Sequence, residues 1–189
     1  MIRHLPNTIT VIRIALVFPI GWLLWEGQYM ASLVVVVLAG VSDAVDGYLA
    51  RRFRWTSQFG AYADPLADKL LVTTVLVVLT IQTHIPLWLA VLSVVRDVVI
   101  LCGAATYRKL FGSLEVAPTF VSKANTAAQI VMLVMVVISL TDSPPVSAWA
   151  ALIADPWAFL LVALLSIVSG ADYVNSWARR AARDWRAKD

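Results

Sequence analysis

The sequence predicts an all-α integral membrane protein with six transmembrane helices, and three observations lead to this prediction. Hydrophobic residues make up 60% of the 189 residues, whereas soluble domains contain about 45–50%. Apolar windows of about twenty residues, long enough to cross a bilayer, follow one another with short connections. Lysine and arginine collect at the ends of alternate windows. We therefore expect one membrane domain over residues 1–189. The six windows are residues 8–25, 30–52, 58–82, 86–107, 122–140 and 157–177.

The first three windows are separated by a glycine and a polar connection. The first window contains Arg13, and no clear small-residue cleavage site follows it, so we expect a span and not a signal peptide. Gly27 lies between the first window and the second. The polar connection from Arg51 to Ser57 joins the second window to the third. We expect these two spans to form a helical hairpin.

The last three windows are separated by longer or helix-breaking segments. Segment 110–121 connects the fourth window to the fifth, and we expect it on the cytoplasmic surface. Asp142 to Pro145 and the pair Asp155-Pro156 contain helix breakers, which predict a loop before the sixth window. Tryptophans near span ends are typical of interfacial anchors. They are Trp22, Trp25, Trp88 and Trp177.

The basic residues predict the topology. None lies in the connections near Gly27, near His84 or over 141–156. By the positive-inside rule, both termini and the hairpin turn are therefore cytoplasmic, and we expect a multi-pass protein of a bacterial inner membrane. Attraction to anionic membrane lipids accounts for the formal charge of +3, and no nucleic-acid partner is expected because no separate basic module exists. The basic residues at span ends are Arg3, Arg51, Arg52, Arg54, Arg108, Lys109, Arg179, Arg180, Arg183, Arg186 and Lys188.

Four aspartates lie inside the second and third windows, where an ionised carboxylate costs about 2.5–3.5 kcal/mol on insertion scales. Asp43 and Asp46 are three residues apart, which places both on one face of a helix. Asp64 and Asp68 are four apart, with the same consequence. Asp46 and Asp64 each lie nine residues from Trp55, and so at nearly the same depth in a hairpin. Four converging carboxylates predict a site for one or two hard divalent cations.

These aspartates belong to a longer pattern, Asp-x-x-Asp-Gly-x-x-Ala-Arg-(x8)-Gly-x-x-x-Asp-x-x-x-Asp, which is met without a gap. The pattern resembles the signature of the CDP-alcohol phosphatidyltransferases. Structural polar contacts within a helical bundle are the alternative explanation. The matching residues are Asp43, Asp46, Gly47, Ala50, Arg51, Gly60, Asp64 and Asp68.

The resemblance implies a reaction and its metal cofactor. CDP-diacylglycerol would bind with its pyrophosphate on Mg²⁺ or Mn²⁺, with two ions expected. An acceptor hydroxyl would attack the phosphorus attached to diacylglycerol, and CMP would leave. By position, Asp43, Asp46, Asp64 and Asp68 are the implied metal ligands. Asp64 and Asp68 are the implied catalytic residues, with Asp68 as the base toward the acceptor hydroxyl.

The resemblance also implies a CDP-binding set. Gly47 and Ala50 would border the cytidine pocket, where a larger side chain obstructs the nucleotide. Arg51 would contact its phosphates, and an ordinary positive-inside residue is the alternative there. In the first window, PNTITVIR resembles the first-helix pattern of the family, while helix capping by Asn7 is the alternative. The implied CDP-binding residues are Asn7, Thr10, Gly47, Ala50, Arg51 and Gly60.

The acceptor must be inferred from weaker features in the fourth and fifth windows. Arg96, next to Asp97, is a second intramembrane charge, and either it binds an anionic acceptor or the two residues form a structural pair. Lys123 either joins the acceptor site or extends its charged end to the interface. Asn125 is the third candidate. The expected acceptor-binding residues are therefore Arg96, Lys123 and Asn125.

The local sequences favour one acceptor within the family. VVRDVVI and PTFVSKANTAAQ resemble the CMP-forming cardiolipin synthases, which use phosphatidylglycerol. Phosphatidylglycerophosphate synthases, which use glycerol 3-phosphate, tend to carry Lys-x-Lys in the fifth span, where this chain has Lys123-Ala124-Asn125. One lysine fewer favours an acceptor with less negative charge. Phosphatidylglycerol is therefore the preferred prediction, glycerol 3-phosphate the alternative and another alcohol the third choice.

Two other classes of protein are alternatives to a phosphatidyltransferase. An ion or proton transporter also carries intramembrane charges, but it often shows paired repeat halves with broken helices, and no repeat is evident in this sequence. A membrane scaffold leaves the four aspartates unexplained. A homodimer is expected from the family resemblance alone.

Overall fold

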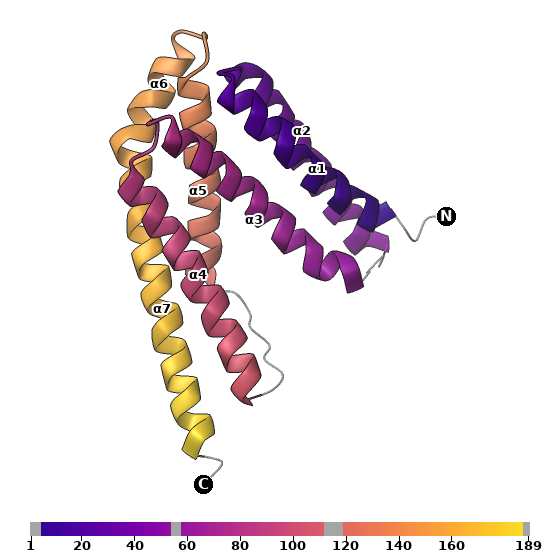
Figure 1. The fold of residues 1–189 in the computed structure, drawn as a ribbon, viewed down its shortest axis with the longest axis vertical. Coiled ribbons are helices and arrows are strands. Elements are labelled where there is room, and N and C mark those ends of the chain that lie inside the picture. Colours follow the sequence, from indigo (N-terminus) through magenta and orange to yellow (C-terminus); the bar gives the residue numbers. More distant parts are fainter. Residues whose placement is uncertain (1–4, 54–57, 112–118, 187–189) are drawn as a thin grey trace. The chain divides into compact units, whose positions relative to one another are not determined.

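A computed structural model describes residues 5–53, 58–111 and 119–186, and side chains chiefly within 14–42, 67–103 and 119–177. The described residues form helices and short turns without a strand, which confirms the all-α prediction (Figure 1). The first five predicted windows each coincide with a helix to within four residues at either end, whereas α7 continues to Arg186, beyond the end of the sixth window at 177. The elements are α1 Leu5–Trp25, α2 Tyr29–Phe53, α3 Gln58–Ile81, α4 Leu87–Phe111, α5 Phe120–Ser139, α6 Val146–Leu152, η2 Ile153–Ala158 and α7 Phe159–Arg186.

The predicted loop before the last span is wrong over Val146–Leu152, which form α6, whereas the predicted break at Asp155-Pro156 is confirmed. The turn before Val146 is not helical, and η2 lies between α6 and α7. The backbone departs from helical angles at Asp155, with φ −116° and ψ 118°. Pro156 lacks the N–H that a regular helical hydrogen bond needs, and its ring crowds the preceding turn. The helix is therefore interrupted at this point, and the two helical segments meet across a kink.

The chain forms two compact units, and the first comprises Met1–Ile85 and Leu133–Ala151. In it, α1 packs against both α2 and α3. The α1 side chains Ile20 and Leu24 are fully buried. A Cβ at Gly21 would lie 3.1 Å from Cγ2 of Thr74 on α3, so the glycine permits close approach of these two helices.

Polar side chains tie together one end of the first unit. The amide nitrogen of Gln82 donates to the carbonyl oxygens of Leu24 at 3.0 Å and Trp25 at 3.2 Å. Carbonyls in the last turn of a helix have no partner within that helix, so Gln82 supplies what α1 lacks. Nearby in sequence, the hydroxyl of Tyr29 lies 3.2 Å from Nε2 of His84. These contacts connect the α1–α2 turn to the end of α3.

The second unit comprises Pro86–Met132 and Leu152–Asp189. In it, α4 packs along α7. The two helices run in the same direction, because Arg96 contacts Ser169 and, further along both, Gly103 faces Trp177. A Cβ at Gly103 would lie 1.2 Å from Cζ3 of Trp177. The indole therefore occupies the space that a side chain at position 103 would need.

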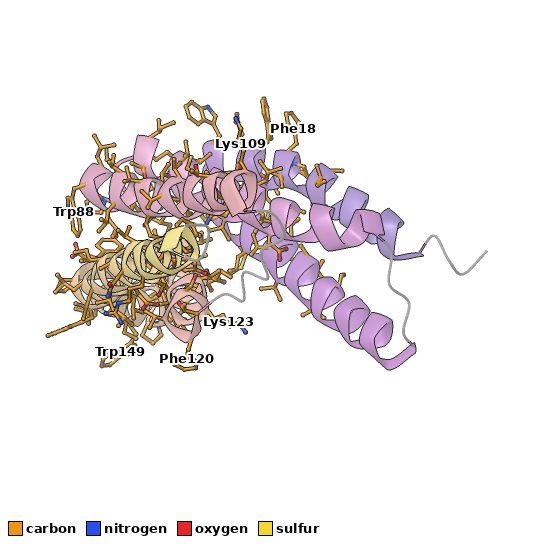
Figure 2. All side chains as sticks on the ribbon, turned by 90° about the horizontal axis from the view of Figure 1, so that it is seen from below. Phe18, Trp88, Lys109, Phe120, Lys123 and Trp149 are labelled. Carbon is orange, nitrogen blue, oxygen red and sulfur yellow. The ribbon has the colours of Figure 1, made fainter. Side chains whose placement is uncertain are left out.

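Large hydrophobic side chains are exposed on the long helices. Phe18 is 76% exposed, Phe120 84% and Trp149 65%, and Figure 2 shows each of them projecting away from its helix. Among the described residues, two helical segments are long and apolar enough to cross a membrane, Phe120–Ser139 and Val146–Trp177. A lipid environment accommodates such side chains, whereas extended apolar surface is rare on soluble monomers.

Candidate functional site

The predicted metal ligands lie in two helices of the first unit. Asp43 and Asp46 fall within α2, and Asp64 and Asp68 fall within α3. Each pair is therefore held about one helical turn apart by continuous helix. The side chains of Asp43, Asp46 and Asp64 lie outside the described part of the structure, and that of Asp68 is exposed. Among the described side chains no group of three potential metal ligands occurs, so the metal site stays a prediction.

The predicted CDP-binding residues lie on α1, α2 and α3, and the last two of these helices also carry the predicted metal ligands. Asn7 and Thr10 fall within α1, and Gly60 falls within α3. Gly47, Ala50 and Arg51 fall within α2, and all six have side chains outside the described part. Because α1 packs against both α2 and α3, one packed set of helices carries every predicted metal and CDP residue. Oxygen-only carboxylate ligands suit Mg²⁺ or Mn²⁺.

A buried polar cluster centres on Arg96 in the second unit. Arg96 is 6% exposed, and its Nη1 donates to Oδ1 of Asp97 at 2.9 Å. Its Nη2 donates to the hydroxyls of Ser122 and Ser169, both at 2.6 Å, and its Nε donates to Ser169 at 3.2 Å. We call Arg96, Asp97, Ser122 and Ser169 the arginine layer. A buried guanidinium needs such partners, because removing one side of a buried ion pair costs about 3–5 kcal/mol.

A second polar group lies one turn away on the same helices. The hydroxyl of Ser166 donates to Oδ1 of Asn125 at 3.0 Å, and both side chains are buried. Since Ser122 pairs with Arg96 and Asn125 with Ser166, α5 runs antiparallel to α4 and α7. Three residues back along α4, Ser93 therefore lies at the level of Ser166. We call Ser93, Asn125 and Ser166 the asparagine layer.

The asparagine layer contains two polar atoms without a hydrogen-bond partner among the described residues. They are Nδ2 of Asn125 and Oγ of Ser93. Asn125 is 0% exposed and Ser93 is 1% exposed. A buried polar group without a partner costs about 1–3 kcal/mol. Such groups are uncommon in folded proteins and call for an explanation.

The structure separates the three predicted acceptor residues. Arg96 and Asn125 lie one turn apart in the interface between α4, α5 and α7. Lys123 is exposed, and Figure 2 shows it projecting outward from α5. The Arg96–Asp97 ion pair that was the structural alternative is present. The buried cluster therefore contains Arg96 and Asn125 without a contribution from Lys123.

Sequence reasoning missed the serines of both layers. Ser122, Ser166 and Ser169 are each nearly inaccessible, at 8%, 1% and 0% exposure. On α7 the two serines are three residues apart, which places them on one helical face. That spacing in an apolar helix was the available signal. A serine in an apolar span is common, however, and its partner is visible only in three dimensions.

Comparison with known proteins identifies relatives over most of the chain. The sequence model of the CDP-alcohol phosphatidyltransferase family matches residues 3–173. A CDP-diacylglycerol–glycerol-3-phosphate 3-phosphatidyltransferase of Pseudomonas fluorescens is 37% identical over 173 residues, which are 85% of this chain and 82% of that protein. The CMP-forming cardiolipin synthase of Homo sapiens is 34% identical over 146 residues, 68% of this chain.

The coverage of these relatives differs. The chain spans 48% of the human protein's length. It spans 31% of a cardiolipin synthase (CMP-forming)/mitochondrial hydrolase fusion protein of Schizosaccharomyces pombe, which is 33% identical over 91% of this chain. The family match extends over both units and includes every predicted site residue from Asn7 to Asn125. This chain belongs to the CDP-alcohol phosphatidyltransferase family.

Proposed function

We propose that the protein transfers a phosphatidyl group from CDP-diacylglycerol to phosphatidylglycerol and releases CMP, as a CMP-forming cardiolipin synthase. The observation that carries the reaction type is the unbroken aspartate signature, whose aspartate pairs lie in α2 and α3, two helices that both pack against α1. Membership of the family supports the same reaction. The names of the human and fission-yeast relatives support the acceptor.

In this proposal the aspartates of the first unit bind the divalent ions, and one of them accepts the proton of the acceptor hydroxyl. Asp43, Asp46, Asp64 and Asp68 hold the divalent ions, which when bound neutralise the pyrophosphate and stabilise charge on the transferring group. Asp68 accepts the proton of the attacking hydroxyl. The new bond joins the acceptor oxygen to the phosphorus of the phosphatidyl group, and the bond from that phosphorus to the oxygen of CMP breaks.

The charge balance of the second unit supports an acceptor of low charge. Asp97 neutralises Arg96 at 2.9 Å, and Lys123 lies exposed on α5. A phosphate dianion favours several cationic donors, whereas the described cluster presents hydroxyls, an amide and a paired guanidinium. The glycerol headgroup of phosphatidylglycerol matches such groups.

Glycerol 3-phosphate is the second candidate acceptor. The Pseudomonas fluorescens relative, named for this acceptor, matches over 82% of its own length. A probable phosphatidylglycerophosphate synthase of Mycobacterium tuberculosis is 30% identical over 97% of this chain and 84% of that protein. Replacing Asn125 by lysine tests the distinction, because a second cation in the cluster is expected to raise turnover with glycerol 3-phosphate relative to phosphatidylglycerol.

We also propose that the six predicted spans cross the membrane, with both termini and the turn between the aspartate-bearing helices on the cytoplasmic side. A homodimer is proposed as well. The apolar windows and the distribution of basic residues support this topology. Single cysteines placed at positions 54 and 143, in a chain with Cys102 replaced by serine, test it. A membrane-impermeant maleimide added to sealed right-side-out vesicles is expected to label position 143 alone.

The reaction is tested with purified protein in detergent. CMP release from CDP-diacylglycerol is expected only when a divalent ion and an acceptor are both present, and chelation with EDTA is expected to stop it. Readdition of Mg²⁺ or Mn²⁺ restores it. CMP release that persists unchanged in EDTA would overturn the metal assignment, and no release with any acceptor would overturn the proposed function.

A further inference from the structure

We infer that Ser166 and Ser169 of α7 are positioning residues that fix the two acceptor-side groups, Asn125 and Arg96, in the orientations that acceptor binding requires. This inference rests on the proposed function, since it assigns a role at the acceptor site. It adds α7 to the machinery, although neither serine belongs to the aspartate signature. Its basis is that each serine makes a direct hydrogen bond to one of the two residues.

Ser169 determines the plane of the Arg96 guanidinium. Its hydroxyl oxygen accepts from Nε at 3.2 Å and from Nη2 at 2.6 Å, so it holds one whole edge of the planar group. Ser122 accepts from Nη2 at 2.6 Å and Asp97 from Nη1 at 2.9 Å. Partners on α4, α5 and α7 thus restrict rotation of the guanidinium. Without Ser169, Nε has no other acceptor among the described residues.

Ser166 determines which end of the Asn125 amide stays available. Its hydroxyl donates to Oδ1 at 3.0 Å, so the carbonyl end of the amide is occupied. The amino end, Nδ2, has no partner among the described residues. Because an amide nitrogen is a donor with two N–H groups, Asn125 is oriented to donate to an oxygen atom. An uncharged hydroxyl of a polyol acceptor is the oxygen that this net-neutral cluster suits.

Helix geometry explains why one element can orient both residues. Ser166 and Ser169 are three residues apart on α7, which places them on one face. Gly170 adjoins this face, and a Cβ there would lie 3.9 Å from Cγ of Arg96. A movement of α7 along its axis would therefore shift both hydrogen bonds together. We expect α7 to couple the guanidinium and the amide into a single acceptor-recognition unit.

The test is the kinetics of Ser166→Ala and Ser169→Ala in the full chain, with phosphatidylglycerol varied in detergent micelles at saturating CDP-diacylglycerol. Ser169→Ala is expected to raise the KM for the acceptor about tenfold, equivalent to roughly 1.4 kcal/mol. Ser166→Ala is expected to raise it about threefold, because its bond is uncharged. The KM for CDP-diacylglycerol stays unchanged in both. Ser169→Thr retains the hydroxyl and is expected to restore most of the acceptor affinity.

A matched control separates positioning from packing. Ser32 is a fully buried serine of the first unit whose hydroxyl has no partner among the described residues, so Ser32→Ala is expected to leave both KM values unchanged. Loss of kcat and thermal stability in the α7 variants at unchanged acceptor KM would refute the positioning role. The proposed function fails separately, if the unmodified protein releases no CMP with any acceptor.

Discussion

The two units of this protein differ in how their charged residues are placed. The first carries four aspartates in α2 and α3, of which Asp68, the one whose side chain the structure describes, is exposed. The second balances its charge locally, since Arg96 is paired with Asp97 and surrounded by serine hydroxyls. A bound divalent cation compensates carboxylates that lie in an apolar segment. A balanced cluster is stable by itself and can recognise a neutral group. In the proposed function, this contrast assigns cation binding to the first unit and recognition of the acceptor to the second.

The largest expected effect comes from replacing a carboxylate of the first unit by an uncharged amide. Asp64→Asn and Asp68→Asn are each expected to lower kcat for CMP release by at least about 10³-fold, because ligation is lost at both positions and the base is lost at 68. Steady-state CMP release measures this. Asp142→Asn, at an exposed turn residue, is the control and should keep full activity. Substantial turnover in both the Asp64→Asn and the Asp68→Asn variant would contradict the catalytic role of the first unit.

The next effect tests whether the second unit is balanced. Arg96→Met removes the cation that lies 2.9 Å from the buried Asp97 carboxylate and is expected to lower the free energy of unfolding by about 3–5 kcal/mol. Replacing both residues, Arg96→Met with Asp97→Leu, should recover most of that loss, because no charge then stays buried. Thermal unfolding in detergent compares the two. A double variant less stable than the single one would show that the pair is not a self-balancing unit.

A smaller effect tests the packing that holds the second unit together. Gly103→Ala is expected to lower the free energy of unfolding by about 1–3 kcal/mol, because the new Cβ overlaps the Trp177 ring. The ring would also lose its edge-on contact with Tyr173, at 5.5 Å between centroids. Gly40→Ala is the matched control, since nothing lies within 4 Å of a Cβ there. Equal Tm values for the two variants would contradict the close α4–α7 contact.

The smallest effect concerns the polar end of the first unit. Tyr29→Phe removes the hydroxyl that lies 3.2 Å from His84, and a loss of about 0.5–1.5 kcal/mol is expected. CMP release should stay at the level of the unmodified protein, because this contact lies at the other end of α3 from the aspartates. A large loss of activity with unchanged Tm would place His84 in the catalytic machinery, against this account.

The sequence predicted the helices well because each is a long apolar run. It failed at Val146–Leu152, where a loop was expected and the chain forms α6, whereas the break expected at Asp155-Pro156 is present as a kink. Helix breakers act locally, so the apolar residues between the two breaker pairs still form a short helix. Trp177, predicted as an interfacial anchor, packs on Gly103, while Trp22 and Trp88 are exposed.

The site was predictable to the extent that it is charged. The aspartates stand out because a carboxylate is costly in an apolar helix, and Arg96 was found for the same reason. Ser166 and Ser169 carry no such cost, so nothing in one sequence distinguishes them from packing serines. Lys123 was selected for its charge as well, and its side chain is exposed on α5, outside the buried cluster. Charge identifies candidates, whereas three-dimensional contacts decide which of them act together.

The central claim is phosphatidyl transfer from CDP-diacylglycerol to phosphatidylglycerol. It is tested by giving the purified protein CDP-diacylglycerol, Mg²⁺ and equal concentrations of phosphatidylglycerol and glycerol 3-phosphate, and identifying the lipid product by mass spectrometry. This account predicts cardiolipin as the main product, formed in equal amount to the CMP released. Phosphatidylglycerophosphate as the main product would contradict it.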